Sequence, residues 1–143
     1  MTDGMPGDTA KDIRDRAFAF GCRVARLALS LTPRPGIRSL VDQLLRAGAA
    51  VGANLEEAKA ASTKREFLRD VEISLREARE AWYWLRIYSE LELGDPVIGR
   101  DLVGEADQIV RILTSIVIST KRRMAAIVLV SAFCILNFAL LLS

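Results

Sequence analysis

The sequence contains no histidine, and its only cysteines are Cys22 and Cys134. A chain without histidine has no His-based catalytic triad, no histidine general acid or base, and none of the usual zinc sites. Two cysteines so far apart in the sequence are too few for a disulfide framework or a four-thiolate metal centre. Glycine-rich phosphate loops and carboxylate–metal helix signatures are also absent. We therefore expect a protein that is not an enzyme, with no catalytic residue, no metal and no cofactor.

Proline and glycine are scarce, with four and nine residues among 143, whereas 51% of the residues are hydrophobic. This composition excludes a disordered or collagen-like chain, and the length is that of one domain with a core of ordinary size. Residues 1–8 hold two glycines and a proline and have little apolar surface to bury. We predict that these eight residues form a disordered N-terminus.

Apolar residues between positions 9 and 123 recur at alternating steps of three and four, which is the period of one helix face. Four such stretches, at about 9–31, 37–60, 64–91 and 96–123, are joined by short links. Thr63 and Glu66 form a capping box at the start of the third stretch, and Pro96 suits the first turn of the fourth. The sequence predicts an all-α protein, an antiparallel up-down-up-down four-helix bundle over residues 9–123.

The positions on the apolar face of each stretch form the predicted core. They are Ile13, Ala17, Phe20, Val24, Leu27 and Leu31; Val41, Leu44, Gly48, Val51, Leu55 and Ala58; Phe67, Val71, Ser74, Ala78, Ala81, Leu85 and Tyr88; and Ile98, Leu102, Ala106, Ile109, Leu113 and Ile116. Gly48 and Gly52 lie four residues apart among alanines, and small residues at that spacing let another helix approach closely. We therefore predict close packing at these glycines rather than a hinge.

Residues 124–143 contain no charged residue, and as a helix they would extend about 30 Å, the thickness of the hydrocarbon core of a bilayer. Their eleven Ile, Leu, Val and Phe residues contribute about −3 to −7 kcal/mol on the insertion scale. Lys121, Arg122 and Arg123 precede the segment, as the positive-inside rule expects of a cytoplasmic flank. We predict a C-terminal transmembrane helix that anchors the bundle at the cytoplasmic face of the inner membrane. The alternatives are a fifth core helix or the translated edge of a neighbouring reading frame, and without insertion the protein would be soluble in the cytoplasm.

The formal net charge of +2 conceals an uneven distribution of charge. Residues 11–46 carry eight basic and three acidic side chains, whereas residues 90–107 carry six acidic side chains and one basic side chain. The basic region could contact nucleic acid phosphates, or it could contact the acidic region within one molecule or between subunits. The candidate nucleic-acid-binding residues are Arg16, Arg23, Arg26, Arg38 and Arg46.

Residues 44–90 resemble a bacterial four-helix-bundle family named for members encoded by intervening sequences within large-subunit ribosomal RNA genes. The pattern comprises an aromatic-rich first helix, a Leu-x-x-Gln-Leu-x-Arg-like segment, an Ala-Asn-x-x-Glu element, a Glu-Phe step and an Ala-x-x-Glu stretch. These elements correspond to Phe18 and Phe20, residues 41–46, residues 53–57, Glu66 with Phe67, and residues 78–80. The motif residues with an expected structural role are Asn54, Glu56, Glu57, Phe67 and Glu80, and Asn54 is a candidate for a buried polar group that fixes register.

The resemblance implies a small helical bundle that assembles into a ring-shaped homo-oligomer, a pentamer. A related protein, the accessory variability determinant of diversity-generating retroelements, is a basic pentamer that binds nucleic acid and a reverse transcriptase. The near-neutral charge and the apolar tail of this chain depart from that pattern. We therefore expect a non-enzymatic oligomeric binding scaffold, with RNA or DNA as candidate partner and the membrane contacted through residues 124–143. The alternative is a purely structural or protein-binding homo-oligomer with no role in nucleic acid binding.

Overall fold

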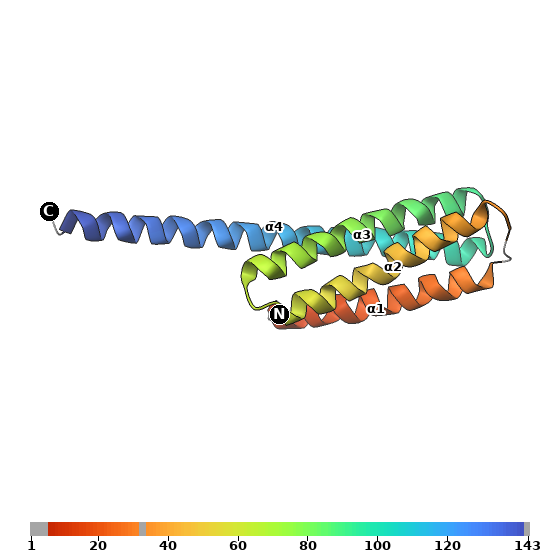
Figure 1. Cartoon of the computed structure of the whole chain (residues 1–143), viewed down its shortest axis with the longest axis horizontal. Helices are drawn as coiled ribbons and strands as arrows, with labels where there is room; N and C mark the ends of the chain where they lie inside the picture. The colour runs from red at the N-terminus through yellow and green to blue at the C-terminus, as the bar shows by residue number, and fades with distance from the viewer. Residues whose placement is uncertain (1–5, 32–33, 142–143) are drawn as a thin grey trace, which may run out of the picture.

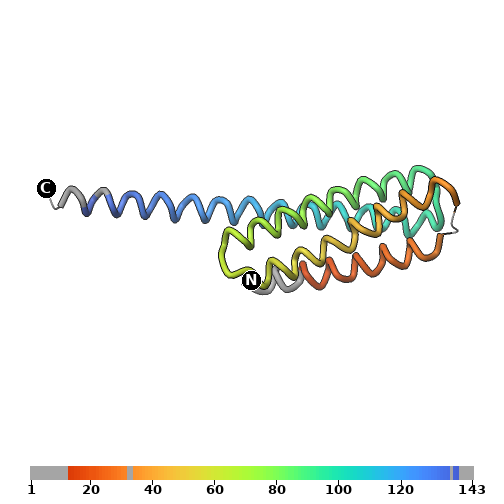
Figure 2. The backbone as a smooth tube through the Cα atoms, in the orientation of Figure 1, coloured from red at the N-terminus to blue at the C-terminus, as the bar shows by residue number. Residues whose placement is uncertain are grey.

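The computed structural model describes residues 6–31 and 34–141, and within these ranges it contains four helices and no strand. The helices are α1 (Pro6–Ser30), α2 (Ile37–Ala60), α3 (Lys64–Glu90) and α4 (Pro96–Leu141). Each helix runs antiparallel to the one before it, and α4 closes the bundle against α1 (Figure 1, Figure 2). In the described part of the chain, α1 does not contact α3 and α2 does not contact α4, so these pairs lie diagonally across the bundle. The prediction of an all-α four-helix protein is confirmed.

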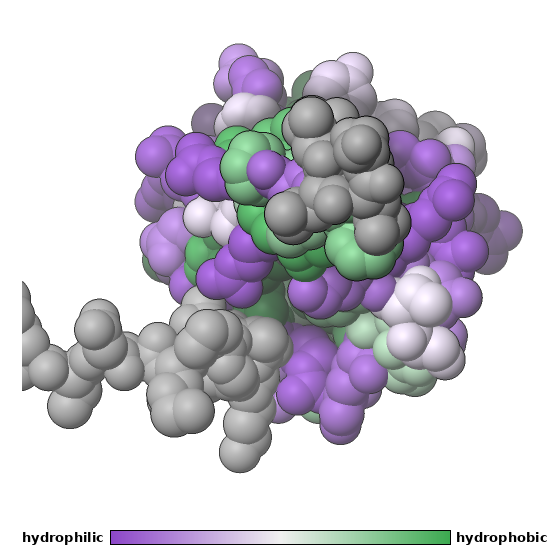
Figure 3. Space-filling model, turned by 90° about the vertical axis from the view of Figure 1, so that its left-hand side faces the viewer, coloured by the Kyte–Doolittle hydropathy of each residue, from purple (hydrophilic) through white to green (hydrophobic). Residues whose placement is uncertain are grey.

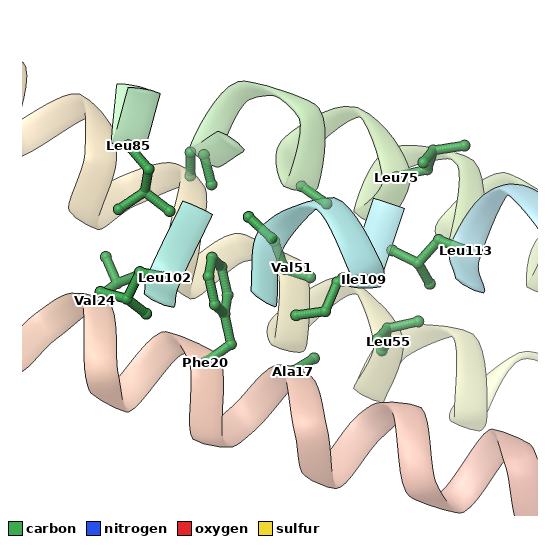
Figure 4. Close-up of a cluster of buried hydrophobic side chains, with 14 of the residues drawn as sticks. Ala17, Phe20, Val24, Val51, Leu55, Leu75, Leu85, Leu102, Ile109 and Leu113 are labelled. Carbon is green, nitrogen blue, oxygen red and sulfur yellow. The ribbon is translucent and has the colours of Figure 1, made fainter. Parts of the chain in front are cut away.

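The core is built from one apolar stripe on each helix, and these stripes face a common axis (Figure 4). Most of the positions predicted from the period of three and four are buried, including Phe20, Val51, Leu85 and Ile109. Ser74 is the one serine in this set, and its Oγ donates a hydrogen bond of 2.8 Å to the carbonyl oxygen of Val51. Because this bond satisfies the buried hydroxyl, a polar residue is accommodated in the stripe. At the ends of the stripes the prediction was less accurate, since Ile98 is largely exposed and Val117, which was not predicted, is buried.

Local side-chain hydrogen bonds define where two of the helices begin. The hydroxyl of Thr63 accepts from the backbone N–H of Glu66, and the Glu66 carboxylate accepts from the backbone N–H of Thr63, both at 3.1 Å. This reciprocal pair is the predicted capping box, and it begins α3. At the start of α4 the Asp95 carboxylate accepts from the backbone N–H groups of Val97 and Ile98, with Pro96 as the first helical residue. The predicted place of Pro96 in the first turn is confirmed.

The helices extend further than the sequence predicted at both ends of the chain. Helix α1 begins at Pro6 and so includes residues 6–8, which were assigned to a disordered terminus, while residues 1–5 lie outside the described part. Helix α4 continues without a break through Arg123 to Leu141. The prediction that the fourth helix ends near Arg123 is therefore wrong, because the loss of charge after this position brings no proline or glycine that would end a helix.

The C-terminal half of α4 projects from the bundle as a single helix (Figure 1, Figure 2). Its apolar side chains are exposed, with Leu129 and Ile135 each 70% accessible. Across the described residues, however, no helix has both the length and the apolar character needed to cross a membrane. The prediction of a transmembrane helix over residues 124–143 is therefore not supported. Residues 142–143 and the side chains at 136 and 139–141 lie outside the described part of this range.

Helices α1 and α2 approach each other most closely at Gly48. A Cβ atom at this position would lie 2.8 Å from Cγ1 and 3.1 Å from Cβ of Val24 on α1. Nearby, a Cβ at Gly52 would lie 3.6 Å from the carbonyl oxygen of Ala17, so the two backbones run close together over more than one turn. Helix α2 is continuous through both glycines. The prediction of close packing rather than a hinge is confirmed.

Substitution of Gly48 by Ala tests this contact. Alanine gains about 1 kcal/mol in helix propensity, but the β-branched Val24 is too stiff to move aside, and overpacking costs typically about 1–3 kcal/mol. We expect G48A to lower the free energy of unfolding measured by urea titration, and the double variant V24A/G48A to lose less than V24A and G48A together. The control is G104A, because a Cβ at this glycine of α4 would have no neighbour within 4 Å. G104A should be stabilising, and equal effects of G48A and G104A would contradict the close packing.

Candidate functional site

Two of the predicted arginines lie at the seam between α1 and α4. The Arg16 guanidinium donates to both carboxylate oxygens of Glu105, with Nε–Oε1 and Nη2–Oε2 distances of 2.6 and 2.8 Å, and it also donates to the side-chain oxygen of Gln108. Two turns further along α1, Arg23 pairs with Asp101. This seam has the least backbone contact of the four, so the charge pairs hold α1 and α4 together where apolar packing is thinnest.

The spacing of the residues explains how two pairs form at the same seam. Arg16 and Arg23 are seven residues apart and lie on one face of α1, while Asp101 and Glu105 are four apart and lie on one face of the antiparallel α4. The hydrogen bonds from Arg16 lower the pKa of Glu105, against the opposing effect of its partial burial. A bidentate pair between guanidinium and carboxylate is also the stronger kind of charge-assisted hydrogen bond.

Arg46 occupies the equivalent position at the seam between α2 and α3. Its guanidinium donates to Glu77 at 3.1 Å and also to Glu80. Glu80 in addition accepts a 3.3 Å hydrogen bond from the indole N–H of Trp84. The bond from Arg46 is the largest cause of a lowered pKa at Glu80. Glu77 is itself buried on α3, so Arg46 compensates a carboxylate that would otherwise lose its hydration.

The other two predicted arginines, Arg26 and Arg38, are exposed, and neither forms an ion pair with any of the described residues. They lie near the connection between α1 and α2, as does the exposed Arg34. The five predicted arginines therefore do not form one continuous basic surface. Three are neutralised within the chain, and their carboxylate partners were missed because they lie 31 to 89 positions away in the sequence. The acidic character of residues 90–107 was the available signal for two of these partners.

The family-motif residues have several different surroundings. Asn54 is half-buried and its side-chain amide donates to the carbonyl oxygen of Ala50 at 2.7 Å, so its bond lies within α2 and does not fix register between helices. Glu56 and Glu57 are exposed on the outside of α2, and Glu56 lies 3.8 Å from the Arg14 guanidinium. Phe67 is half-buried against the core.

The three basic residues before the apolar tail, Lys121, Arg122 and Arg123, also have different surroundings. Lys121 Nζ lies 2.6 Å from a carboxylate oxygen of Glu72 on α3 and so ties α4 to its neighbour. Arg122 and Arg123 are both exposed, and Arg123 also lines a cavity between the helices.

Two apolar patches lie on the outer faces of the bundle. On α3, Tyr83 is 53% exposed and packs edge-to-face against Trp84, with ring centroids 5.2 Å apart. On α1, Phe18 is 73% exposed, and Leu29 lies three turns further along the same outer face. Exposed aromatic side chains of this kind are typical of protein contact surfaces. Of these residues only Phe18 was singled out from the sequence, as part of the family pattern, and its exposure was not predicted.

Residues 10–115, about three-quarters of the chain, match the family described as 23S rRNA-intervening sequence protein. The chain belongs to this family. A solved structure from Bacteroides thetaiotaomicron VPI-5482, of a protein with unknown function from the S23 ribosomal protein family, is similar with a TM-score of 0.67. The two sequences are 26% identical, and the similarity covers 76% of this chain and 97% of that chain. No curated protein matches the sequence. In this member of the 23S rRNA-intervening sequence protein family, the matched part corresponds to the bundle, and the projecting end of α4 lies beyond it.

The Arg16–Glu105 pair should make the free energy of unfolding depend on pH. Because the folded-state pKa of Glu105 is lowered, its contribution is present above the unfolded-state pKa and is lost as the pH falls through the folded-state value. We expect E105Q to cost about 1 kcal/mol at pH 7 and progressively less as the pH falls below the usual range for a carboxyl group. Chemical unfolding at a series of pH values measures this difference. The control is D107N, which removes an exposed pair between Asp107 and Arg111 within α4 and should have a smaller effect. An E105Q effect that grows toward acid pH would contradict the assignment.

Proposed function

We propose that this protein is a non-enzymatic scaffold that associates with copies of itself and binds other proteins through apolar faces of the bundle. The supporting observation is that three of the five candidate arginines are paired with carboxylates of the same chain, while aromatic side chains remain exposed outside. Arg16, Arg23 and Arg46 are engaged by carboxylates of their own molecule, which removes three of the five arginines proposed for phosphate contact. The structural and protein-binding alternative therefore has more support than the nucleic-acid interpretation.

The arrangement of the two patches favours a head-to-tail contact between copies. Within the described residues α1 and α3 are diagonal to each other, so their outer faces point to opposite sides of the bundle. A contact between the Phe18 face of one copy and the Tyr83 face of the next joins two different surfaces. Such a heterologous contact propagates and closes into a ring when the rotation between copies permits it. The pentamer implied by the family resemblance is a closed assembly of this kind.

A mixing experiment tests the head-to-tail contact. We expect F18E and Y83E each to be monomeric by size-exclusion chromatography with light scattering, because each variant retains only one of the two faces. Mixed in equal amounts, they should form a heterodimer through the intact Tyr83 face of F18E and the intact Phe18 face of Y83E. The matched control is V97E, at an exposed apolar residue outside both patches, which should leave the wild-type mass unchanged.

A wild-type chain that elutes as a monomer would overturn the proposal of self-association. An assembly that survives both single substitutions would overturn the head-to-tail arrangement. The same chromatogram, read at 260 and 280 nm, would reveal co-purifying nucleic acid. RNA or DNA is the second candidate partner, favoured by the exposed Arg26, Arg34 and Arg38 near one connection. Retention that weakens steeply with salt would indicate phosphate contacts.

For the projecting part of α4 we propose attachment to a membrane. The support is the charge-free sequence after Arg123 and the exposure of large apolar side chains such as Leu129 and Phe133 along the part of α4 that projects from the bundle (Figure 1). Exposed apolar surface of this extent is costly in water and marks a membrane or partner contact. The bundle would then lie at the membrane surface with Arg122 near the headgroups.

Fractionation of cells tests the attachment. We expect the full chain to sediment with membranes, to resist extraction with alkaline carbonate and to be released by detergent. A chain that ends at Arg123 keeps the whole buried core and should remain in the supernatant. Release of the full chain by carbonate would contradict the attachment.

A further inference from the structure

A cavity of about 480 Å³ lies between the four helices at the end of the bundle from which α4 projects. This volume is within the range of sites that bind small molecules. Every helix contributes to its wall: the first half of α1, the last turns of α2, the first turns of α3, and the part of α4 just before the projecting segment. Figure 3, which views the molecule from this end, shows hydrophobic side chains exposed between hydrophilic ones.

The inner wall of the cavity is apolar. Leu55, Phe67 and Ile116 face it, together with the buried Ile13 and Val71. At this end of the bundle the last buried residue of α4 among those described is Val117, and α2 ends at Ala60.

The remainder of the wall carries polar groups of one electrostatic sign. Among the side chains that the structure describes, three basic and three hydroxyl side chains line it and no carboxylate does: Arg14, Lys59, Arg123, Ser115, Ser119 and Thr120. Within the described part of the chain, Lys59 and Arg123 form no ion pair, in contrast to Lys121 and the arginines at the helix seams. Cations without an intrachain counter-ion, set beside an apolar wall, favour a ligand that supplies both an anion and an apolar body.

From this arrangement we infer that the cavity binds a small anionic amphiphile, a carboxylate or phosphate group carried on an acyl chain. The anion contacts Lys59 and Arg123 and accepts hydrogen bonds from hydroxyl groups of α4, while the acyl chain packs against Leu55, Phe67 and Ile116. A free fatty acid and an anionic membrane phospholipid share this chemistry. The inference does not depend on self-association or on membrane attachment, because all of the lining residues belong to one bundle.

Photolabelling of the full chain tests the inference. The protein, in neutral detergent, is irradiated with dodecanoate that carries a diazirine near the end of its chain, and the adducts are located by peptide mass spectrometry. We expect adducts on residues 55–71 and 113–120, suppressed by excess dodecanoate but not by dodecanol or acetate, which lack the charge or the chain. Adducts confined to residues 124–141, or equal suppression by dodecanol, would overturn the inference.

Matched variants separate charge recognition from general hydrophobic labelling. K59Q and R123Q should each raise the dodecanoate concentration needed for half-suppression about tenfold, the effect of losing one charge-assisted hydrogen bond. R122Q removes the neighbouring exposed arginine, which does not line the cavity, and should behave as wild type. K59Q and R123Q that both behave as wild type would overturn the inference.

A second probe identifies the source of the ligand. Phosphatidylglycerol with a diazirine in its acyl chain is presented in vesicles with the full chain. Labelling of the cavity residues by this lipid supports a membrane source, and labelling by dodecanoate alone supports a soluble fatty acid. Failure of both probes to label these residues would overturn the inference.

Discussion

The bundle depends on one constraint: each helix buries a single apolar stripe against a shared axis, and the stripe repeats with the period of the helix. Once that stripe is buried, every other position has a fixed relation to it. Residues beside the stripe lie at the seams between neighbouring helices, where Arg16 meets Glu105 and Arg46 meets Glu77 and Glu80. Residues opposite the stripe face outward, as Phe18 and Tyr83 do. Charge pairing and exposed aromatic surface are thus both consequences of the same periodicity.

This dependence explains which features could be predicted from the sequence. The core positions are determined by local spacing, so Val24, Leu85 and Ile109 were assigned correctly before any contact was known. Helix beginnings marked by a side-chain cap, as at Thr63, are equally local. The end of α4 was not predictable in this way. At residue 124 the side chains change from charged to apolar, and a change in side-chain polarity does not interrupt the backbone hydrogen bonds of a helix. The change in composition therefore led us to predict two helices where the structure has one, α4.

The candidate site was predicted less completely because it depends on partners distant in the sequence. Spacing placed Arg16 and Arg23 on one face of α1, but two different surroundings were compatible with that face: solvent, or a neighbouring helix with carboxylates. Which surroundings the two arginines have depends on the orientation of α4, which places Asp101 and Glu105 at the seam with α1. The cavity was missed for a similar reason, since its wall is assembled from residues of four helices and not from any motif.

The distribution of matched and unmatched charge over the structure limits what the protein can recognise. A carboxylate already held by an arginine of its own molecule offers a partner little electrostatic gain, because the partner would have to displace a bidentate pair. The seams at Arg16 and Arg46 are therefore poor recognition surfaces in spite of their charge. The fold leaves other groups unmatched: the exposed aromatic side chains of α1 and α3, the apolar end of α4, the exposed arginines near the connection between α1 and α2, and the basic groups that Lys59 and Arg123 present to the cavity. Two of these lie at the same end of the molecule, where α4 leaves the bundle, so a ligand in the cavity would contact the helix segment from which the projecting part begins.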